Sequence, residues 1–249
     1  MNKNVVLILF MILSFPTFAQ RYSGDYDGGY GFGSRIRMGF RFAPTIVSNY
    51  VEAGRRFNGF DSGGLDMRVS LGPTADFFFA EKYAFSTGLL YTVKSVHYSV
   101  PSRFYNDEIF SASPVPKAEQ SGDASYNLQY LQVPLTLKLY TDELFDRTKM
   151  YIQCGGMVDI KVAEKPLDKY TNAIYQFQQR LPSNQNVFGF GDANLVLGLG
   201  LEYNLGRGMD AVFFGIQYQR GLVEINNQRA FDDLITKNNI IQLEMGVRF

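Results

Sequence analysis

Apolar and polar residues alternate strictly along the last segment of the chain, residues 238–249. A period of two is the pattern of a β-strand whose two faces meet different environments. The apolar positions are Ile241, Leu243, Met245, Val247 and Phe249, and the positions between them are Gln242, Glu244, Gly246 and Arg248. The segment therefore predicts an amphipathic strand that ends on an aromatic residue.

The same alternation recurs in seven earlier segments, each with one continuous apolar face. They are 35–43, 65–78, 83–99, 130–140, 150–163, 192–203 and 211–222. The connections between the eight segments alternate in length. Long stretches at 44–64, 100–124, 164–189 and 224–237 alternate with short ones near 80–82, 141–149 and 204–209. Long external loops and short periplasmic turns are typical of bacterial outer-membrane barrels.

These patterns predict an all-β fold, an eight-stranded antiparallel up-and-down transmembrane β-barrel. Segments near ten residues match a tilted crossing of the hydrocarbon layer, and closure satisfies every backbone group in lipid. The even strand number places both termini in the periplasm. A soluble lipocalin-like barrel is the rival fold, but its outside would be polar. Pro134 lies inside segment 130–140, where its missing N–H predicts a bulge.

The N-terminus predicts export to the cell outer membrane. Lys3 precedes an apolar run from Val5 to Leu13, and Thr17 and Ala19 precede a cleavage site ahead of Gln20. We interpret 1–19 as a signal peptide, because the apolar run is shorter than the ~20 residues of a spanning helix. The Gly- and Tyr-rich stretch 20–33 is interpreted as a flexible periplasmic leader or as an aromatic platform for a partner. The barrel domain is then 34–249.

Composition narrows the choice further. The 24 basic and 24 acidic residues give a formal net charge of +0 with no basic run, so we expect no nucleic-acid partner. Cys154 is the only cysteine, which excludes an internal disulfide and suits a lipid-facing position. The 22 Phe and 16 Tyr residues supply enough aromatic side chains for interfacial girdles.

The face opposite the apolar one carries charges of both signs. We expect these to form a polar network in the lumen, either as a structural plug of paired charges or as the lining of a narrow solute channel. The basic members are Arg35, Arg37, Arg41, Arg68, Lys94, Lys138, Lys161 and Arg248; the acidic members are Asp66, Asp159, Asp192, Glu202 and Glu244. The first and last strands must be neighbours at closure, so Arg35 or Arg37 is predicted to meet Glu244.

Several segments resemble known outer-membrane barrels. The ending on Phe249, with Val247 and Met245, resembles the C-terminal assembly signal of Gram-negative barrels, which implies the barrel-assembly machinery as a partner. YLQVPLTLKLY at 130–140, LVLGLGLEY at 195–203, FGIQYQRGL at 214–222 and the terminal LEMGVRF together resemble the PorT-like outer-membrane β-barrel family. That resemblance implies the barrel fold and an accessory role in type IX protein secretion. It implies no catalytic residue.

One residue could serve as a catalytic group. His97 is the only histidine and lies near Ser95 and Ser99 on the same strand face. A serine nucleophile needs a base and an orienting acid in contact, and no spacing identifies the acid. A lone histidine also disfavours a transition-metal site. We therefore expect no enzymatic activity, no metal and no cofactor.

The sequence thus predicts a non-enzymatic structural or interaction barrel, an accessory of type IX protein secretion. The alternatives are a narrow porin-like channel for small solutes and an outer-leaflet lipid-modifying enzyme. The expected partners are outer-membrane lipid and lipopolysaccharide, the barrel-assembly machinery and secretion-system subunits. Asp107, Glu108, Asp232 and Asp233 in the outer loops either contact divalent ions of the lipopolysaccharide layer or remain solvated.

Overall fold

A computed structural model describes residues 35–55, 58–99, 123–167, 187–207, 209–226 and 234–249. The predicted signal peptide and leader, and the four loop carboxylates at 107, 108, 232 and 233, lie outside these residues. Among the residues described, no helix is long and apolar enough to cross a membrane.

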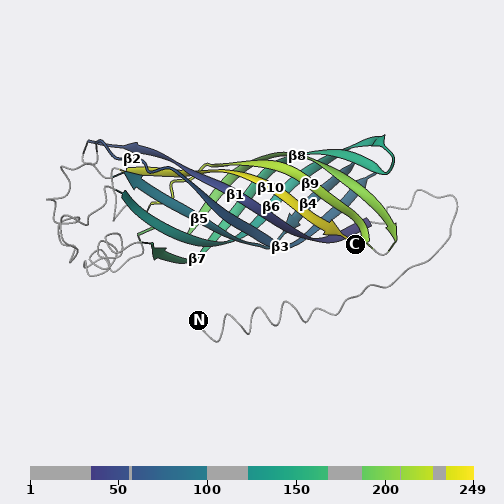
Figure 1. The fold of residues 1–249 in the computed structure, drawn as a ribbon, viewed down its shortest axis with the longest axis horizontal. Helices are drawn as coiled ribbons and strands as arrows, with labels where there is room; N and C mark the ends of the chain where they lie inside the picture. The colour runs from purple at the N-terminus through teal and green to yellow at the C-terminus, as the bar shows by residue number, and fades with distance from the viewer. Residues whose placement is uncertain (1–34, 56–57, 100–122, 168–186, 208, 227–233) are drawn as a thin grey trace, which may run out of the picture. The chain divides into compact units, whose positions relative to one another are not determined.

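The described chain forms one antiparallel sheet (Figure 1). Its strands are β1 (Arg35–Ala53), β2 (Asp61–Ser62), β3 (Leu65–Ala80), β4 (Tyr83–Gly88), β5 (Leu90–Ser99), β6 (Asp123–Phe145), β7 (Thr148–Pro166), β8 (Gly191–Arg207), β9 (Met209–Gly221) and β10 (Leu234–Arg248).

The sheet closes into a ring of eight strands, because β1 pairs with β3 on one side and with β10 on the other. β4 and β5 together form one strand of the wall, interrupted at Leu89, and β2 is a short addition at the end of β5. The predicted eight-stranded up-and-down barrel is confirmed. Figure 1 shows the strands winding obliquely around one axis, with the start of β1 and the end of β10 together. We call this the turn end and the opposite one the loop end.

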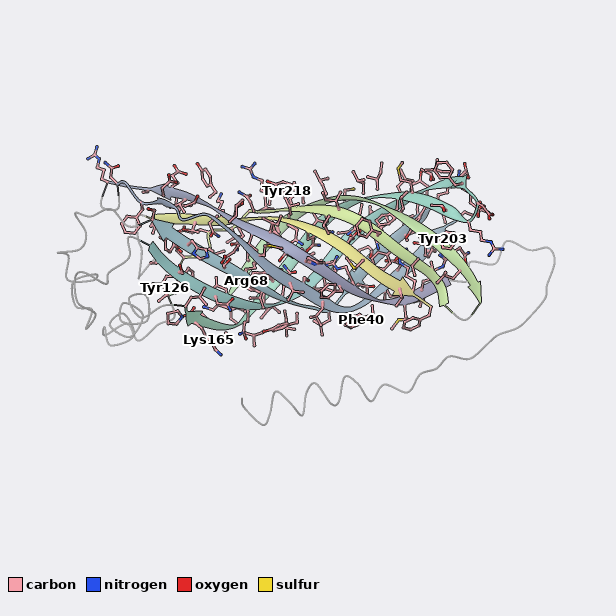
Figure 2. The ribbon with its side chains drawn as sticks, in the orientation of Figure 1. Phe40, Arg68, Tyr126, Lys165, Tyr203 and Tyr218 are labelled. Atoms are coloured by element: carbon pink, nitrogen blue, oxygen red, sulfur yellow. The ribbon has the colours of Figure 1, made fainter. Side chains whose placement is uncertain are left out.

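Apolar side chains cover the outside of the wall, as the alternation predicts (Figure 2). On β8, Leu197 and Leu199 are 52% and 55% exposed, whereas the inward Val196 between β8's outward leucines is fully buried. Cys154 is also exposed on this outer face. The inward face is polar along most of the barrel, so the two faces have the environments that a membrane barrel requires.

Several strands are longer than the sequence pattern indicates. β1 continues to Ala53 and β10 begins at Leu234, although 44–64 and 224–237 are predicted as loops. The two strands stay paired through this extension, from Ser48 opposite Asn239 to Ala53 opposite Leu234. Outward residues such as Ser48 and Asn239 are polar, so the alternation of apolar and polar residues ends with the apolar band. The wall itself extends beyond it.

The predicted bulge at Pro134 is wrong. β6 pairs with β7 in unbroken register through Val133, Pro134 and Leu135. The interruption lies instead in the neighbouring strand, because β4 ends at Gly88 and β5 begins at Leu90, with register to β6 preserved across the gap. A proline without an N–H is tolerated where the neighbouring strand offers no ladder partner.

Beyond this break, the wall has a seam between β3 and β5. Within the described residues, the two strands pair only at Ser70 with Thr92 and Leu71 with Tyr91. Farther toward the loop end, β3 pairs with β1 alone, and the end of β5 pairs with β2. Gly63, next to β2, donates its backbone N–H to the His97 carbonyl at 3.0 Å. A short stretch of wall between β3 and β5 therefore lacks a direct strand ladder.

The outward band yields a first prediction. Leu199→Arg lies at the middle of β8 in that band and is expected to cost about 2–4 kcal/mol of unfolding free energy, because a cation at mid-depth meets hydrocarbon. Glu52→Arg is the matched control, since Glu52 is outward and exposed on the extension beyond the band, and it should cost about 0–1 kcal/mol. Urea unfolding of the refolded protein in lipid vesicles measures both. Equal losses would show that the band does not face lipid.

Candidate functional site

The lumen near the turn end contains a dense group of charges, which we call the turn-end cluster. Its members are Arg37, Arg41, Asp76, Lys138, Glu202, Glu244 and Arg248.

Arg248 is the centre of the turn-end cluster. Its Nε lies 3.0 Å from Asp76 Oδ2, and its terminal nitrogen contacts Glu202. Lys138 Nζ lies 3.1 Å from the same Asp76 carboxylate, and Arg37 NH1 lies 3.0 Å from Glu202. Asp76 and Glu202 thus each contact two cations, which lowers the free-energy cost of burying each charge.

Arg41 and Glu244 form the remaining ion pair of this cluster, at 3.2 Å, with both side chains less than a twentieth exposed. The predicted pairing of Arg37 with Glu244 is therefore wrong, and the Arg35 side chain lies outside the description. The reason is register: Arg41 is opposite Gly246 in the β1–β10 ladder, one inward position from Glu244. Arg37 lies two inward positions farther toward the turn end.

Aromatic rings enclose the same cluster. The Arg248 guanidinium lies 4.5 Å from the Phe213 ring centre and donates to Tyr140 Oη at 2.6 Å. Tyr151 donates to Glu244 Oε1 at 2.7 Å. Cation–π contacts of this kind stabilise a desolvated guanidinium. Space for Tyr151 comes from Gly200 and Gly215, where an added Cβ would approach the tyrosine hydroxyl at less than 3.0 Å.

Toward the loop end, Lys94, Asp159 and Asp192 form a second group, the lysine–aspartate trio. Lys94 Nζ lies 2.5 Å from Asp159 Oδ2 and 3.0 Å from Asp192 Oδ2, and all three side chains are fully buried. Asn194 donates to Asp159 at 2.8 Å, and Asn238 donates to Asp192 at 2.9 Å. The two carboxylates therefore have both a shared cation and amide donors.

The two groups complement each other in charge. The turn-end cluster has four cations and three carboxylates, an excess of +1. The trio has one cation and two carboxylates, an excess of −1. Together they are neutral. Between them lies a layer of uncharged polar side chains, in which Thr92 donates to Gln132 at 2.6 Å and Gln242 donates to Gln217.

An apolar cap fills the interior beyond the trio. It contains Phe60, Val96, Tyr98, Ala124, Tyr126, Leu128, Tyr130, Val187, Phe188, Ile225 and Leu234, all buried. Tyr126 packs edge-on against Phe188, with ring centres 5.0 Å apart. The cap is not predicted from the sequence, although the inward parity of Tyr126, Leu128 and Tyr130 is a usable signal for it.

Lys161 lies at the wall of this cap and pairs with a residue that the sequence analysis assigned to a loop. A bulge in β7 shifts the register, since Tyr130 is opposite Lys161 but Gln129 is opposite Ala163. The extra residue turns Glu164 inward, where it lies 2.6 Å from Lys161 Nζ. Glu164 also accepts backbone N–H groups from Val187 and Phe188, so this pair fixes the cap to the wall.

Asp66 and Arg68 join neither lumen group. They lie at the seam, where Arg68, labelled in Figure 2, is placed on β3. Arg68 donates to Asp66 Oδ2 at 2.8 Å. The same oxygen contacts His97 Nε2, and His97 Nδ1 lies 2.8 Å from Ser125 Oγ. The structure therefore supplies, in Asp66, the acid that sequence spacing left unidentified, and it brings Ser125 to His97 rather than Ser95 or Ser99.

The terminal residues Met245, Val247 and Phe249 lie on the outward face of the last strand. Phe249 is 57% exposed, and its backbone exchanges hydrogen bonds with Met38 at 2.9 and 3.2 Å. Their part in barrel assembly stays a prediction. No group of three or more His, Cys, Asp or Glu residues suited to a metal ion occurs within the described part of the chain.

Comparison with known proteins identifies the family. The family model "Outer membrane protein beta-barrel domain" matches residues 18–227. The chain belongs to this outer-membrane β-barrel family. The protein therefore resides in the outer membrane, with its apolar band in lipid, and the short turns mark the periplasmic side. No curated protein matches the chain by sequence.

Solved barrels with a similar fold are distant in sequence. OprG from Pseudomonas aeruginosa is 14% identical, with 87% of this chain and 97% of that one covered and a TM-score of 0.44. AlkL is 15% identical, with 91% and 94% covered and a TM-score of 0.44. The Neisserial surface protein NspA is 10% identical, with 84% and 97% covered and a TM-score of 0.41.

The trio yields a second prediction. Lys94→Met leaves two buried carboxylates without their cation and should cost about 3–5 kcal/mol of unfolding free energy. Lys82→Met is the matched control, because the Lys82–Asp142 pair of 2.7 Å is exposed and such pairs contribute at most about 1 kcal/mol. Urea titrations in vesicles compare the two variants. Similar losses would mean that Lys94 does not compensate the aspartates.

Proposed function

We propose that this outer-membrane barrel is a sealed structural and interaction protein rather than a solute channel. The observation that carries the proposal is the filled lumen. From the periplasmic to the external end, the lumen contains the turn-end cluster, the layer of uncharged polar side chains, the trio and the apolar cap. An eight-stranded barrel has an interior that side chains can fill.

A solute channel is the alternative that the sequence analysis leaves open. It would need a continuous water path through the lumen. The apolar cap lies across that path, and its Tyr98, Leu128 and Phe188 side chains are at most 1% exposed. Opening such a path would also hydrate charges that now compensate one another. The filled interior therefore favours the sealed barrel.

The resemblance to the PorT-like family supports a more specific role, as an accessory of type IX protein secretion. In that role, the periplasmic turns would contact secretion-system subunits, and the external end would face lipopolysaccharide. The β6–β7 turn offers an apolar contact, because Leu144 and Phe145 are 50% and 74% exposed there.

Electrical recording tests the sealed lumen. The refolded protein in planar bilayers is expected to give no discrete conductance steps, because the described lumen is filled along its length. A known porin, inserted under the same conditions, is the positive control. Reproducible steps from folded wild-type protein would contradict the proposal and support the solute channel.

Cross-linking tests the secretion role separately. Affinity purification of the barrel from gently cross-linked native membranes should recover secretion-system subunits, and Phe145→Ser should reduce that recovery several-fold. Leu222→Ser is the matched control, since Leu222 is 56% exposed but lies at the loop end. Recovery of the barrel alone, or equal recovery with both variants, would count against an accessory of secretion.

A further inference from the structure

The seam between β3 and β5 holds three residues in the order that nucleophilic catalysis requires. Asp66 on β3 contacts His97 on β5, and His97 contacts Ser125 on β6 at 2.8 Å. His97 and Ser125 are direct partners in the β5–β6 ladder, so the pairing register itself fixes their separation. The His97 and Asp66 side chains are 17% and 24% exposed. The His97 and Asp66 side chains are therefore held by contacts and are still partly accessible to solvent.

We propose that Asp66, His97 and Ser125 form a serine-hydrolase site that cleaves carboxylic esters of long acyl chains at the outer surface of the membrane. The site lies in the wall, so the proposal goes beyond the sealed lumen and does not depend on it.

We assign the neutral imidazole to these contacts. A carboxylate accepts, so the His97 Nε2–H donates to Asp66, and the unprotonated Nδ1 accepts from the Ser125 hydroxyl. A hydroxyl that donates to a neutral imidazole is the arrangement of an activated nucleophile. Arg68 donates to the same Asp66 oxygen at 2.8 Å. This cation favours the ionised carboxylate, which orients the imidazole and stabilises its protonated form.

The reaction follows in two balanced steps. Ser125 Oγ attacks the ester carbonyl carbon while His97 Nδ1 takes the hydroxyl proton. The tetrahedral intermediate then expels the alcohol, which leaves with that proton, and the acyl group stays on Ser125. A water molecule next gives a proton to His97 and attacks the acyl-enzyme. Collapse releases the fatty acid, and the proton returns to Ser125 Oγ.

Asn127 is the candidate donor to the developing oxyanion. It is the next residue after Ser125 on the outward face of β6, about 7 Å along the strand. The donating group would be its side-chain amide Nδ2–H. A side-chain amide that donates to an oxyanion stabilises the transition state, and losing one such donor typically lowers kcat about 10²–10³-fold.

The position of the site indicates an amphiphilic substrate. Along the β5–β6 ladder, the outward pairs run from Tyr91 with Leu131, through Val93 with Gln129, to His97 with Ser125. The site therefore lies just beyond the apolar band. On β3, the sequence neighbours of Asp66, Leu65 and Met67, point outward and are 73% and 75% exposed. An acyl chain lying on these side chains would place its ester near Ser125.

The first experiment labels the nucleophile. Full-length protein refolded in vesicles is treated with a fluorophosphonate probe, which reacts with activated serines. We expect labelling of wild type and of Ser99→Ala, and loss of labelling in Ser125→Ala and His97→Gln. Ser99 is a suitable control because it lies on the same face of β5 as His97. Heat-dependent gel mobility verifies that each variant is folded. Absent labelling of folded wild type, or unchanged labelling of Ser125→Ala, would overturn the proposal.

The second experiment identifies the ester. Fatty-acid release is measured from phosphatidylethanolamine vesicles and, separately, from vesicles containing lipopolysaccharide. Release from either supports the proposal and distinguishes the two lipid sources; release from neither overturns the lipid ester as substrate. Ser125→Ala should abolish release. As a positioning residue, Asp66 should affect kcat more than KM, so Asp66→Asn is expected to lower kcat about 10²–10⁴-fold with KM nearly unchanged.

Discussion

Compensation of buried charge is the constraint on which this barrel depends. Its lumen is narrow, and Arg248, Lys94, Asp159 and Glu244 are at most 2% exposed. An isolated ion in such a place costs several kcal/mol. Three features reduce this cost. Carboxylates are shared between cations, and aromatic rings surround Arg248. An excess charge of +1 near the turns is balanced by −1 near the loops. The resulting contacts join strands that are far apart in the ring, so they also fill the interior.

Polar groups in the wall must also have partners. Backbone groups in a barrel are satisfied by neighbouring strands, and the stretch between β3 and β5 lacks that ladder. Side chains take over there: Asn49 Oδ1 accepts the His97 backbone N–H at 3.1 Å, and Asp66, His97 and Ser125 join the three strands. An irregular part of the wall thus brings together polar groups that a regular ladder would have kept apart. This is how a barrel with a filled lumen can still present chemistry on its surface.

The features that depend on inward–outward alternation could be predicted from the sequence. Those that depend on the register of strand pairing could not. Alternation assigned the faces of the eight strands, because side chains on a strand change face at each residue. It did not show that Arg41 rather than Arg37 meets Glu244, since that contact depends on the register of β1 and β10. It also missed the bulge that turns Glu164 inward and the seam that brings Asp66 to His97, because both are departures from regular pairing. The extension of the wall beyond the lipid band was not predicted, because outward residues such as Ser48, Glu52 and Asn239 interrupt the apolar alternation.

A double-mutant cycle on Arg41 and Glu244 tests the compensation of lumen charge most directly. The pair is less than a twentieth exposed, and Arg41 and Glu244 come from neighbouring strands at the point of closure. The unfolding free energies of wild type, Arg41→Met, Glu244→Gln and the double variant are measured in vesicles. The account predicts that the double variant loses less than the sum of the single losses, with a coupling of about 1–3 kcal/mol. Losses that add within about 0.5 kcal/mol would contradict it.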